Sequence, residues 1–195
     1  MSFLKKLGIK TFSQRTPSNV GKWDGWHGDV TDTELYGDDT TYKLAADFLS
    51  DCREVEDWGC GKGGFRNFCR TEYIGIDGSK SKFADKIADL ATYQSTAEGI
   101  LLRHVLEHNV QWDMILANAV ASFRKKLCLI IFTPFADKTK EIRYFKDLDV
   151  PDIAFLRTDL TKHFAGLDWK SEEGIPTKTD YHAEHVFYVQ KPDKS

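Results

Sequence analysis

Apolar residues along the chain fall into strand-like runs and into stretches with helical periodicity. A continuous apolar run at 127–132 is stopped by Pro134, which is typical of a strand buried on both faces. Residues 40–49 and 112–123 instead place apolar side chains three and four positions apart, which predicts two amphipathic helices. Because strand-like and helical segments alternate, we expect a mostly parallel sheet covered by helices.

The same reading predicts the remaining elements and the domain organisation. We see no internal repeat and no boundary after residue 40, so we expect an N-terminal arm or lid over 1–39 and a single domain over 40–195. A late pair of strands would close one edge of the sheet. Further strands are expected at 54–57, at 72–77, at 86–90, from 100 onward and at 183–189, and short helices at 63–70 and 159–164.

Net charge and length narrow the class of protein. The chain has 195 residues, and 41% of them are hydrophobic. A chain of this length buries a sizeable core without disulfides or metals. Its 27 basic and 30 acidic residues give a formal net charge of −3, which creates no field for bulk binding of DNA or RNA. We therefore expect no nucleic-acid partner.

Cellular location is also constrained by the sequence. No apolar run approaches the roughly 20 residues of a membrane-spanning helix, and residues 1–12 lack the features of a signal peptide. The basic residues within 1–22 allow only weak contact with an anionic membrane surface. We expect a cytoplasmic protein with free thiols, because there is no Cys-x-x-Cys pair among Cys52, Cys60, Cys69 and Cys128.

A glycine-rich turn follows the strand expected at 54–57. Such a turn lets the backbone approach a ligand closely and aims amide groups at it. An acid stands two positions before the first glycine, where it suits the cationic end of a ligand. The pattern reads acid-x-Gly-x-Gly-x-Gly at Asp57, Gly59, Gly61 and Gly63.

The glycines alone leave a second kind of cofactor open. Gly59, Gly61 and Gly64 also fit the Gly-x-Gly-x-x-Gly spacing of dinucleotide sites, with Asp77 after the next strand. Binding of a nicotinamide cofactor therefore has to be considered. Lys62 is followed by glycine and not by Ser or Thr, which disfavours a Walker A phosphate loop.

The turn resembles the first motif of the class I S-adenosylmethionine-dependent methyltransferases, and later matches follow in the order of that family. Asp77 stands where the family's acid binds the ribose hydroxyls, and Asp89 with Leu90 resembles the pair that contacts adenine. Residues 104–108 read His-Val-Leu-Glu-His, a segment found after the fourth strand in many small-molecule members. The resemblance covers residues 55–135.

The resemblance implies an α/β fold: a Rossmann-like seven-stranded, mostly parallel sheet with helices on both faces and an antiparallel last strand. It also implies an enzyme that uses S-adenosylmethionine and releases S-adenosylhomocysteine. The chain departs from the family where a full helix shrinks to residues 78–83. The cofactor-binding residues implied by the resemblance are Asp57, Gly59, Cys60, Gly61, Gly63, Asp77, Gly78, Asp89, Leu90, Arg103 and His104.

Histidines are the candidate general bases. Methyl transfer mainly requires alignment and exclusion of water, and an alcohol acceptor also benefits from a base. We consider His104, His108 and His182, in that order. Residues 104–108 also match a His-x-x-Glu-His zinc pattern, but the segment begins at a strand end and Asn109 interrupts any long helix, so we expect no metal.

The acceptor is expected to bind near residues 136–157, because loops after strand ends build sites on α/β sheets. The family signature of amide and amine methylation is absent after the fourth strand, so the resemblance favours O-methylation of a sugar, a glycan or another small molecule. Two alternatives stay open. One is a non-catalytic module that docks partners through Trp23 and Trp26, and the other is an NAD-linked oxidoreductase.

Overall fold

A computed structural model describes residues 18–27 and 31–192. Seven strands form one sheet in the order β3-β2-β1-β4-β5-β9-β8. β1 to β5 are parallel to one another, while β9 runs antiparallel to both β5 and β8, so the predicted antiparallel last strand is confirmed. The strands are β1 (Glu54–Trp58), β2 (Glu72–Asp77), β3 (Lys86–Ile87), β4 (Gly99–Arg103), β5 (Lys126–Ile131), β8 (Asp168–Pro176) and β9 (Ala183–Gln190).

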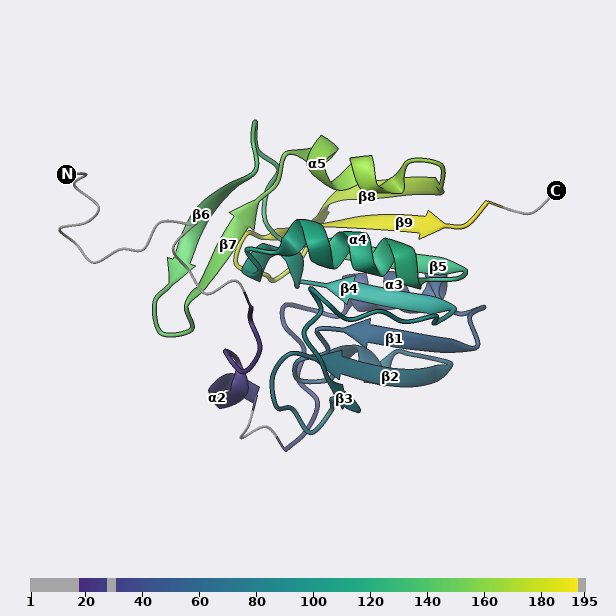
Figure 1. The fold of residues 1–195 in the computed structure, drawn as a ribbon, viewed down its shortest axis with the longest axis horizontal. Coiled ribbons are helices and arrows are strands. Elements are labelled where there is room, and N and C mark those ends of the chain that lie inside the picture. Colours follow the sequence, from purple (N-terminus) through teal and green to yellow (C-terminus); the bar gives the residue numbers. More distant parts are fainter. Residues whose placement is uncertain (1–17, 28–30, 193–195) are drawn as a thin grey trace.

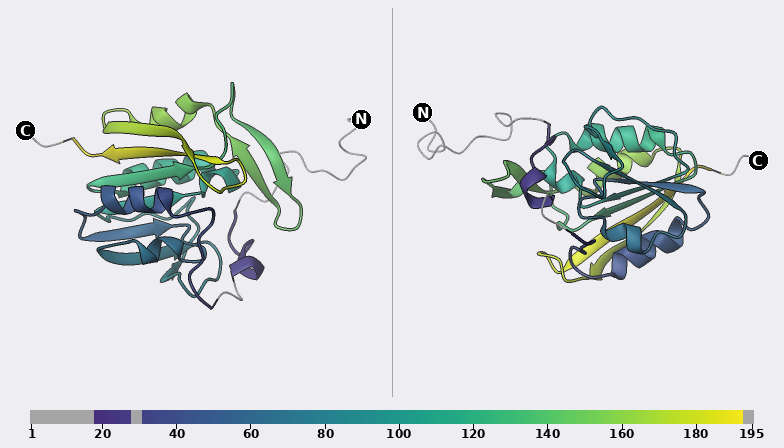
Figure 2. Two further views of the ribbon diagram at one scale, coloured as in Figure 1. Left: turned by 180° about the vertical axis from the view of Figure 1, so that it is seen from behind. Right: turned by 90° about the horizontal axis from the view of Figure 1, so that it is seen from below.

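Helices cover both faces of this sheet. α3 (Thr40–Phe48) lies on one face and α4 (Trp112–Ser122) on the other (Figures 1 and 2). The alternation of side chains along β4 explains the two layers, since Leu101 packs in the core beneath α3 while Ile100 and Leu102 pack in the core beneath α4. The predicted helices on both faces are therefore confirmed.

Two predicted elements are shorter in the structure. The strand expected over 86–90 is limited to β3, and the helix expected over 63–70 is the 3₁₀ turn η2 (Gly64–Asn67). Phe83 explains this compact arrangement, because it packs directly against Gly63 and Gly75, where any side chain would collide with it. The chain after β2 thus folds back on the glycine turn without forming a full helix.

A separate two-stranded sheet stands at the end of the molecule where the parallel strands finish (Figure 1). It consists of β6 (Lys140–Phe145) and β7 (Val150–Ala154), within the segment expected to define the acceptor. Thr133 anchors the hairpin, because its Oγ1 donates a hydrogen bond to the carbonyl of Ile153 at 2.7 Å. The hairpin therefore overhangs the carboxyl ends of the main strands, as does the short helix α2 (Asp24–His27).

The remaining helical turns are η3 (Leu106–His108), α5 (Arg157–Thr161) and η4 (Lys162–Phe164). In the ranges 18–27 and 31–192, no helix has the length and apolar character to cross a membrane. The weak membrane contact predicted for 1–22 falls mainly on residues 1–17, which lie outside the described part of the chain.

Candidate active site

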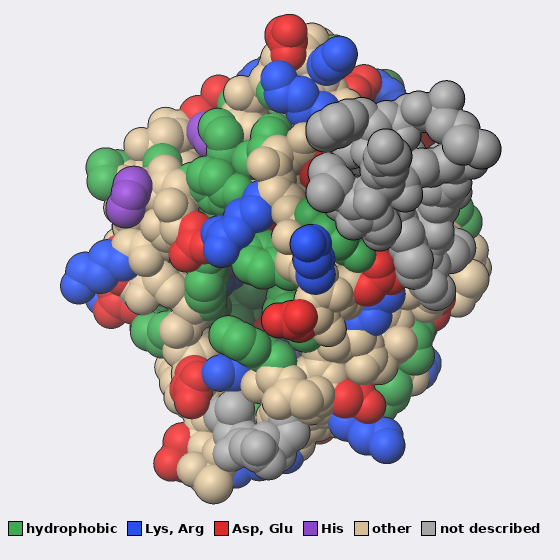
Figure 3. Space-filling model, turned by 90° about the vertical axis from the view of Figure 1, so that its left-hand side faces the viewer, with side chains coloured by type: hydrophobic (Ala, Val, Ile, Leu, Met, Phe, Trp, Pro, Cys, Tyr) green, Lys and Arg blue, Asp and Glu red, His purple; other side chains and the backbone are tan. Residues whose placement is uncertain are grey.

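A cavity of about 570 Å³ opens at the carboxyl ends of β1, β2 and β4. Viewed from this end, hydrophobic side chains surround a central hollow, with charged side chains at its rim (Figure 3). Every predicted cofactor-binding residue except Gly63 lines the cavity, and His108 lines it as well. The tertiary structure therefore brings the scattered motif residues together in one place.

The glycine turn touches the loop that follows β4. Gly59 has a φ of +78°, and a Cβ atom added there would lie 2.3 Å from Cγ2 of Val105. Only glycine satisfies both the backbone angle and this close approach. The two loops are neighbours because β1 pairs directly with β4.

Asp77 is held at the end of β2 by backbone amides. The N–H of Gly61 donates to its Oδ2 at 2.8 Å, and the N–H of Ser79 donates to its Oδ1 at 2.7 Å. Burial raises the pKa of Asp77 despite these hydrogen bonds. The carboxyl group of Asp77 is therefore fixed in the cavity wall, where it links the glycine turn to β2.

Asp57 is a second buried acid in the same wall. The hydroxyl of Tyr73 donates to its Oδ2 at 3.0 Å. Burial raises the pKa of Asp57 to about 7, and the nearby Asp77 adds to this, while Tyr73 and Arg103 act against it. Because a cation favours the ionised form of a buried carboxyl group, this wall is suited to the positive end of a ligand.

Residues 18–27, which we call the N-terminal strap, lie across the cavity beside Asp89, Gly78 and His108. The strap contributes Asn19, Val20, Trp23, Trp26 and His27 to the lining. The hydrogen bonds that hold it include Ser18 Oγ to Asp89 Oδ2 (2.9 Å), Asn19 Nδ2 to the His108 carbonyl (2.8 Å), the Gly21 amide to the Gly78 carbonyl (2.9 Å) and the Trp23 amide to Ser79 Oγ (3.0 Å).

His27 is a cavity residue that the sequence analysis did not identify. Its ring stacks on Trp23 with centroids 6.1 Å apart, and it lies against Gly61. Its Nδ1 is buried without a hydrogen-bond partner among the described residues. Burial lowers the pKa of His27, so the ring is neutral at pH 7. In the sequence, the signal for a role of His27 was its position beside two tryptophans and two glycines.

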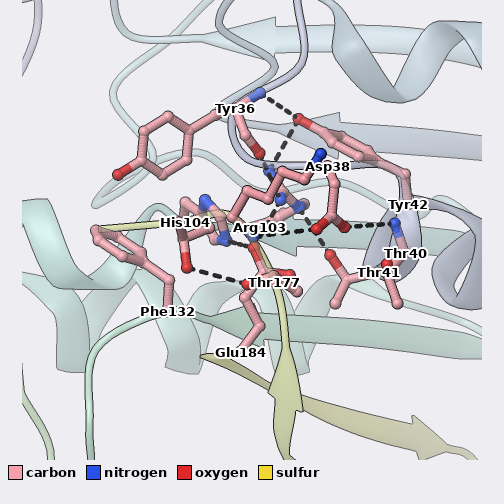
Figure 4. A network of polar contacts seen from close by, with 12 residues as sticks. Tyr36, Asp38, Thr40, Thr41, Tyr42, Arg103, His104, Phe132, Thr177 and Glu184 are labelled. Atoms are coloured by element: carbon pink, nitrogen blue, oxygen red, sulfur yellow. Dashed lines mark hydrogen bonds and ion pairs between the residues drawn. The ribbon is translucent and has the colours of Figure 1, made fainter. Parts of the chain in front are cut away.

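Arg103 anchors a buried network behind the cavity (Figure 4). Its Nη2 donates to Glu184 Oε1 at 2.7 Å and its Nη1 to the Tyr42 hydroxyl at 2.8 Å. The guanidinium also donates to Thr41 and to the carbonyl of Tyr36. Arg103 thus joins β4 to α3 and β9, and a direct contact between Arg103 and a cofactor stays a prediction.

His104 belongs to the same network. Its φ is +56°, and its Nε2 lies 2.6 Å from Glu184 Oε1. Burial and the neighbouring Arg103 lower the pKa of His104 to about 3, although Glu184 acts in the opposite direction. The contacts with His104 and Arg103 hold the pKa of Glu184 below its ordinary value despite burial. A histidine with so low a pKa is a weak proton acceptor at neutral pH.

His108 has a different environment. Its side chain is 17% exposed, and its Nδ1 lies 3.2 Å from Asp152 Oδ1 and 3.0 Å from the carbonyl oxygen of Pro151. Burial acts to lower the pKa of His108, but the contacts with Asp152, Glu107 and Pro151 outweigh it and raise the pKa above 6.5. Of His104 and His108, His108 is therefore the one equipped to accept a proton near neutral pH.

His182 is not on the cavity wall. It is exposed in the turn before β9, where its N–H donates to the carbonyl of Thr179 at 2.9 Å. The preceding residue, Tyr181, is the one that approaches the candidate base, because its hydroxyl donates to Asp152 Oδ2 at 2.9 Å. Asp152 was detectable in principle as a lone charge inside the apolar sequence of β7.

The histidine segment does not form a metal site in the described ranges. No group of three or more His, Cys, Asp or Glu side chains there is arranged to hold an ion. The ring of Phe132 packs against both His104 and His108, at centroid distances of 4.7 and 5.5 Å. The cysteine of the glycine turn, Cys60, is buried. Burial raises the pKa of its thiol, which disfavours a nucleophilic thiolate.

No protein-family model and no curated protein matches this sequence. Solved structures do match it in fold. A 1,6-didemethyltoxoflavin-N1-methyltransferase from Burkholderia thailandensis, crystallised with that compound and S-adenosylhomocysteine, is 14% identical over 80% of each chain, with a TM-score of 0.61. The N-terminal domain of EvdMO1, crystallised in the presence of S-adenosylhomocysteine and D-fucose, is 13% identical over 77% of this chain and 81% of that one, with a TM-score of 0.54.

A third similar structure is the [4+2]-cyclase SpnF, which is 12% identical over 83% of this chain and 84% of that one, with a TM-score of 0.57. The fold of the chain is therefore that of the class I S-adenosylmethionine-dependent methyltransferases. The presence of a cyclase among these structures shows that the fold alone does not define the reaction. The reaction has to be argued from the site.

Proposed function

We propose that this protein is an S-adenosylmethionine-dependent methyltransferase that methylates a hydroxyl group of a small molecule, with a sugar or a glycan end as the preferred acceptor. One observation carries this proposal. A single cavity joins the buried acids of the glycine turn, Asp57 and Asp77, to His108, a histidine whose pKa is raised above 6.5. Such a cavity can place a cationic cofactor beside a proton acceptor.

The residues present fit the proposed cofactor. The cavity volume lies within the range of roughly 300–1,000 Å³ that is usual for ligand sites. Gly59 lets the turn pack directly against Val105 in the loop after β4. The buried acids Asp57 and Asp77 favour a positively charged ligand. Asp77 would hold the ribose, while Asp89 and Leu90 would lie beside the adenine.

When bound, the cofactor supplies a methyl group on a sulfonium, which is already an excellent leaving group. The protein then has to align the acceptor and remove water. His108 would accept the proton of the acceptor hydroxyl. His104, with a pKa of about 3, holds the segment through Glu184 and takes no part as a base.

The rim of the cavity supports a sugar acceptor. Trp23, Trp26 and Phe145 offer flat apolar surfaces, while Arg143 and Asp180 form an ion pair at 2.6 Å beside them. Apolar walls with a few placed polar groups are typical of small-molecule sites. A sugar ring presents both a C–H face and hydroxyl groups. The D-fucose used with EvdMO1 adds support for this class of acceptor.

Calorimetry with S-adenosylhomocysteine and with NAD tests the cofactor. We expect S-adenosylhomocysteine to bind and NAD not to bind, and D77A to weaken binding at least about tenfold, because the fixed carboxyl group is lost. The control is D47A, which removes an exposed acid that forms a surface ion pair with Arg70. Binding of NAD without binding of S-adenosylhomocysteine would contradict the proposal and favour an oxidoreductase.

Mass spectrometry of a panel of acceptors tests the reaction. We expect an increment of one methyl group on sugars or glycan ends, and a far smaller yield of methylated product with H108A after the same reaction time. Because the Burkholderia thailandensis protein is an N-methyltransferase, the panel includes amine analogues of the same sugars. Methylation of the amines alone would contradict the hydroxyl assignment. Cofactor binding without transfer to any member would favour the non-catalytic module.

A further inference from the structure

We propose that Asp152 is the positioning residue of the general base: its carboxylate holds the His108 ring with a proton on Nδ1 and with Nε2 available to the acceptor, and Tyr181 holds that carboxylate in place. The inference rests on the proposed function, since it assigns a partner to the base of that reaction. It also explains why a charged residue lies in the middle of β7.

The contacts at Nδ1 determine the tautomer of His108. Both neighbours of this nitrogen are acceptor groups: the Pro151 carbonyl, 3.0 Å away, accepts its hydrogen bond, and Asp152 Oδ1, 3.2 Å away, is its ion-pair partner. A carbonyl oxygen cannot donate, so Nδ1 must carry the proton. In the neutral ring the free electron pair is then on Nε2, which lies on the side of the imidazole away from Asp152.

The burial of Asp152 requires such partners. The residue is 1% exposed, and its neighbours along β7, Val150, Ile153 and Ala154, are buried apolar residues. A buried carboxylate is strongly disfavoured unless it is paired and hydrogen-bonded. His108 meets one oxygen, and the hydroxyl of Tyr181 donates to the other at 2.9 Å. These two contacts join η3, β7 and the turn before β9.

Other groups also face His108, and their effects on its pKa have to be distinguished from the effect of Asp152. Glu107 precedes it on η3, and the ring of Phe132 packs against both His108 and His104. Oε1 of Glu107 accepts a hydrogen bond from the amide of Phe132 at 2.7 Å, so Glu107 acts on His108 only through its charge. Asp152 alone of these side chains is within hydrogen-bonding distance of Nδ1. The strap side of the ring is occupied by Trp23 at 5.2 Å.

The position of Asp152 also connects the base to the proposed acceptor wall. Asp152 lies in β7, while Arg143 and Phe145 of the paired strand β6 line the cavity. Asp152 is paired with Arg143 in the register of this hairpin. The β6–β7 hairpin, which would contact the acceptor, therefore also carries Asp152. One hairpin would thus align both the acceptor and the base His108.

The test compares D152N with the wild-type protein. We expect kcat to fall at least about tenfold with KM changed less than about twofold, because the asparagine keeps the shape of the side chain and removes its charge. The acidic limb of the kcat/KM profile should move to lower pH. Independently of activity, a ¹H–¹⁵N NMR titration of the His108 ring should show a lower pKa, while Nδ1 stays protonated toward the Pro151 carbonyl. Y181F should shift both readouts in the same direction by a smaller amount.

Two further variants make the result specific. T133V removes the hydrogen bond from Thr133 to Ile153, the residue after Asp152, and adds no charge near His108, so the pKa and tautomer of His108 should not move. E107Q, which changes no contact at Nδ1, should lower the pKa of His108 by less than D152N does. An unchanged His108 pKa in D152N and in Y181F would overturn the inference, and Y181F serves alone if D152N does not fold.

Failure of the two proposals can be distinguished. A protein that transfers no methyl group but shows a lower His108 pKa in D152N would contradict the proposed function and retain the pairing of His108 with Asp152. Methyl transfer with the same kcat and the same His108 pKa in D152N would overturn the pairing and retain the function.

Discussion

His104 and His108 lie in one short segment, yet their environments give them opposite affinities for protons. His104 is enclosed beside Arg103, which with burial lowers its pKa to about 3. His108 meets the carboxylate of Asp152, and its pKa is raised above 6.5. The order of candidate bases expected from the sequence, with His104 first, is therefore reversed in our proposal.

The first prediction concerns these two histidines. We expect H108A to lower kcat by about 10²- to 10⁴-fold, the usual contribution of a general base. H104N should lower it by less than about tenfold, because His104 is a weak proton acceptor and asparagine tolerates the left-handed backbone at this position. Single-turnover rates at pH 8 provide the measurement. A larger loss in H104N than in H108A, at equal thermal stability, would refute this assignment.

A second prediction concerns the glycine turn. Gly59 and Gly166 have the same φ of +78°, but an added Cβ would strike Val105 at Gly59 and meet nothing within 4 Å at Gly166. Alanine at either position carries a backbone penalty of about 1–2 kcal/mol. We expect G59A to be clearly less stable than G166A in urea unfolding, and to lose S-adenosylhomocysteine binding. Equal stability of the two variants would show that the contact with Val105 relaxes without penalty.

At the scale of elements, the N-terminal strap and the β6–β7 hairpin meet above the cavity. Lys22 Nζ of the strap donates to the carbonyl of Asp149 at 2.9 Å and lies 3.4 Å from its carboxylate. The strap also bonds to the loops after β2 and β3. These contacts support the sequence-based expectation of a lid within residues 1–39, which we treat as a proposal.

The lid leads to a third prediction. The double variant N19A/K22A removes the strap's hydrogen bonds to the His108 and Asp149 carbonyls. If the strap covers a bound cofactor, S-adenosylhomocysteine should dissociate several-fold faster, as followed by tryptophan fluorescence in stopped flow. K43A, which breaks an exposed pair with Asp39 on α3, is the control. Unchanged dissociation in N19A/K22A would rule out a closing role for these contacts.

At the scale of the whole molecule, buried ionisable groups make stability depend on pH in opposing directions. Burial raises the pKa of both Asp57 and Glu107 to about 7, so the folded protein binds protons that the unfolded chain has released. Their contribution lowers stability as pH rises from about 4 to 7. His104 acts in the opposite direction, because its pKa is lower when folded, and its contribution increases stability as pH rises from about 3 to 6.5.

The fourth prediction isolates one of these groups. E107Q resembles the protonated acid, keeps an acceptor for the amide of Phe132 and removes the cost of ionising a buried carboxyl group. Its unfolding free energy should match the wild type near pH 4 and exceed it by up to roughly 3 kcal/mol at pH 8, the linkage expected for a pKa moved from 4.5 to about 7. Urea unfolding across this pH range is the measurement. A difference that does not depend on pH would contradict the raised pKa.

Local signals in the sequence were sufficient for the framework of the molecule. The apolar run of β5 and the periodicity of α4 predicted their elements closely, because burial on two faces or on one stripe leaves a pattern within a few residues. The spacing of Asp57, the glycines and Asp77 predicted a shared site, since the carboxyl ends of adjacent parallel strands meet at one edge.

The sequence by itself thus determined the α/β sheet, its antiparallel last strand and the place of the cofactor loops. The tertiary structure decided which histidine meets a carboxylate, brought His27 and Tyr181 toward the site and left His182 outside it. The reason is physical. Each element of the framework leaves a pattern within its own few residues. The partners of His108, which are Asp152 of the hairpin and Trp23 of the strap, are distant in sequence and meet it only when the elements pack.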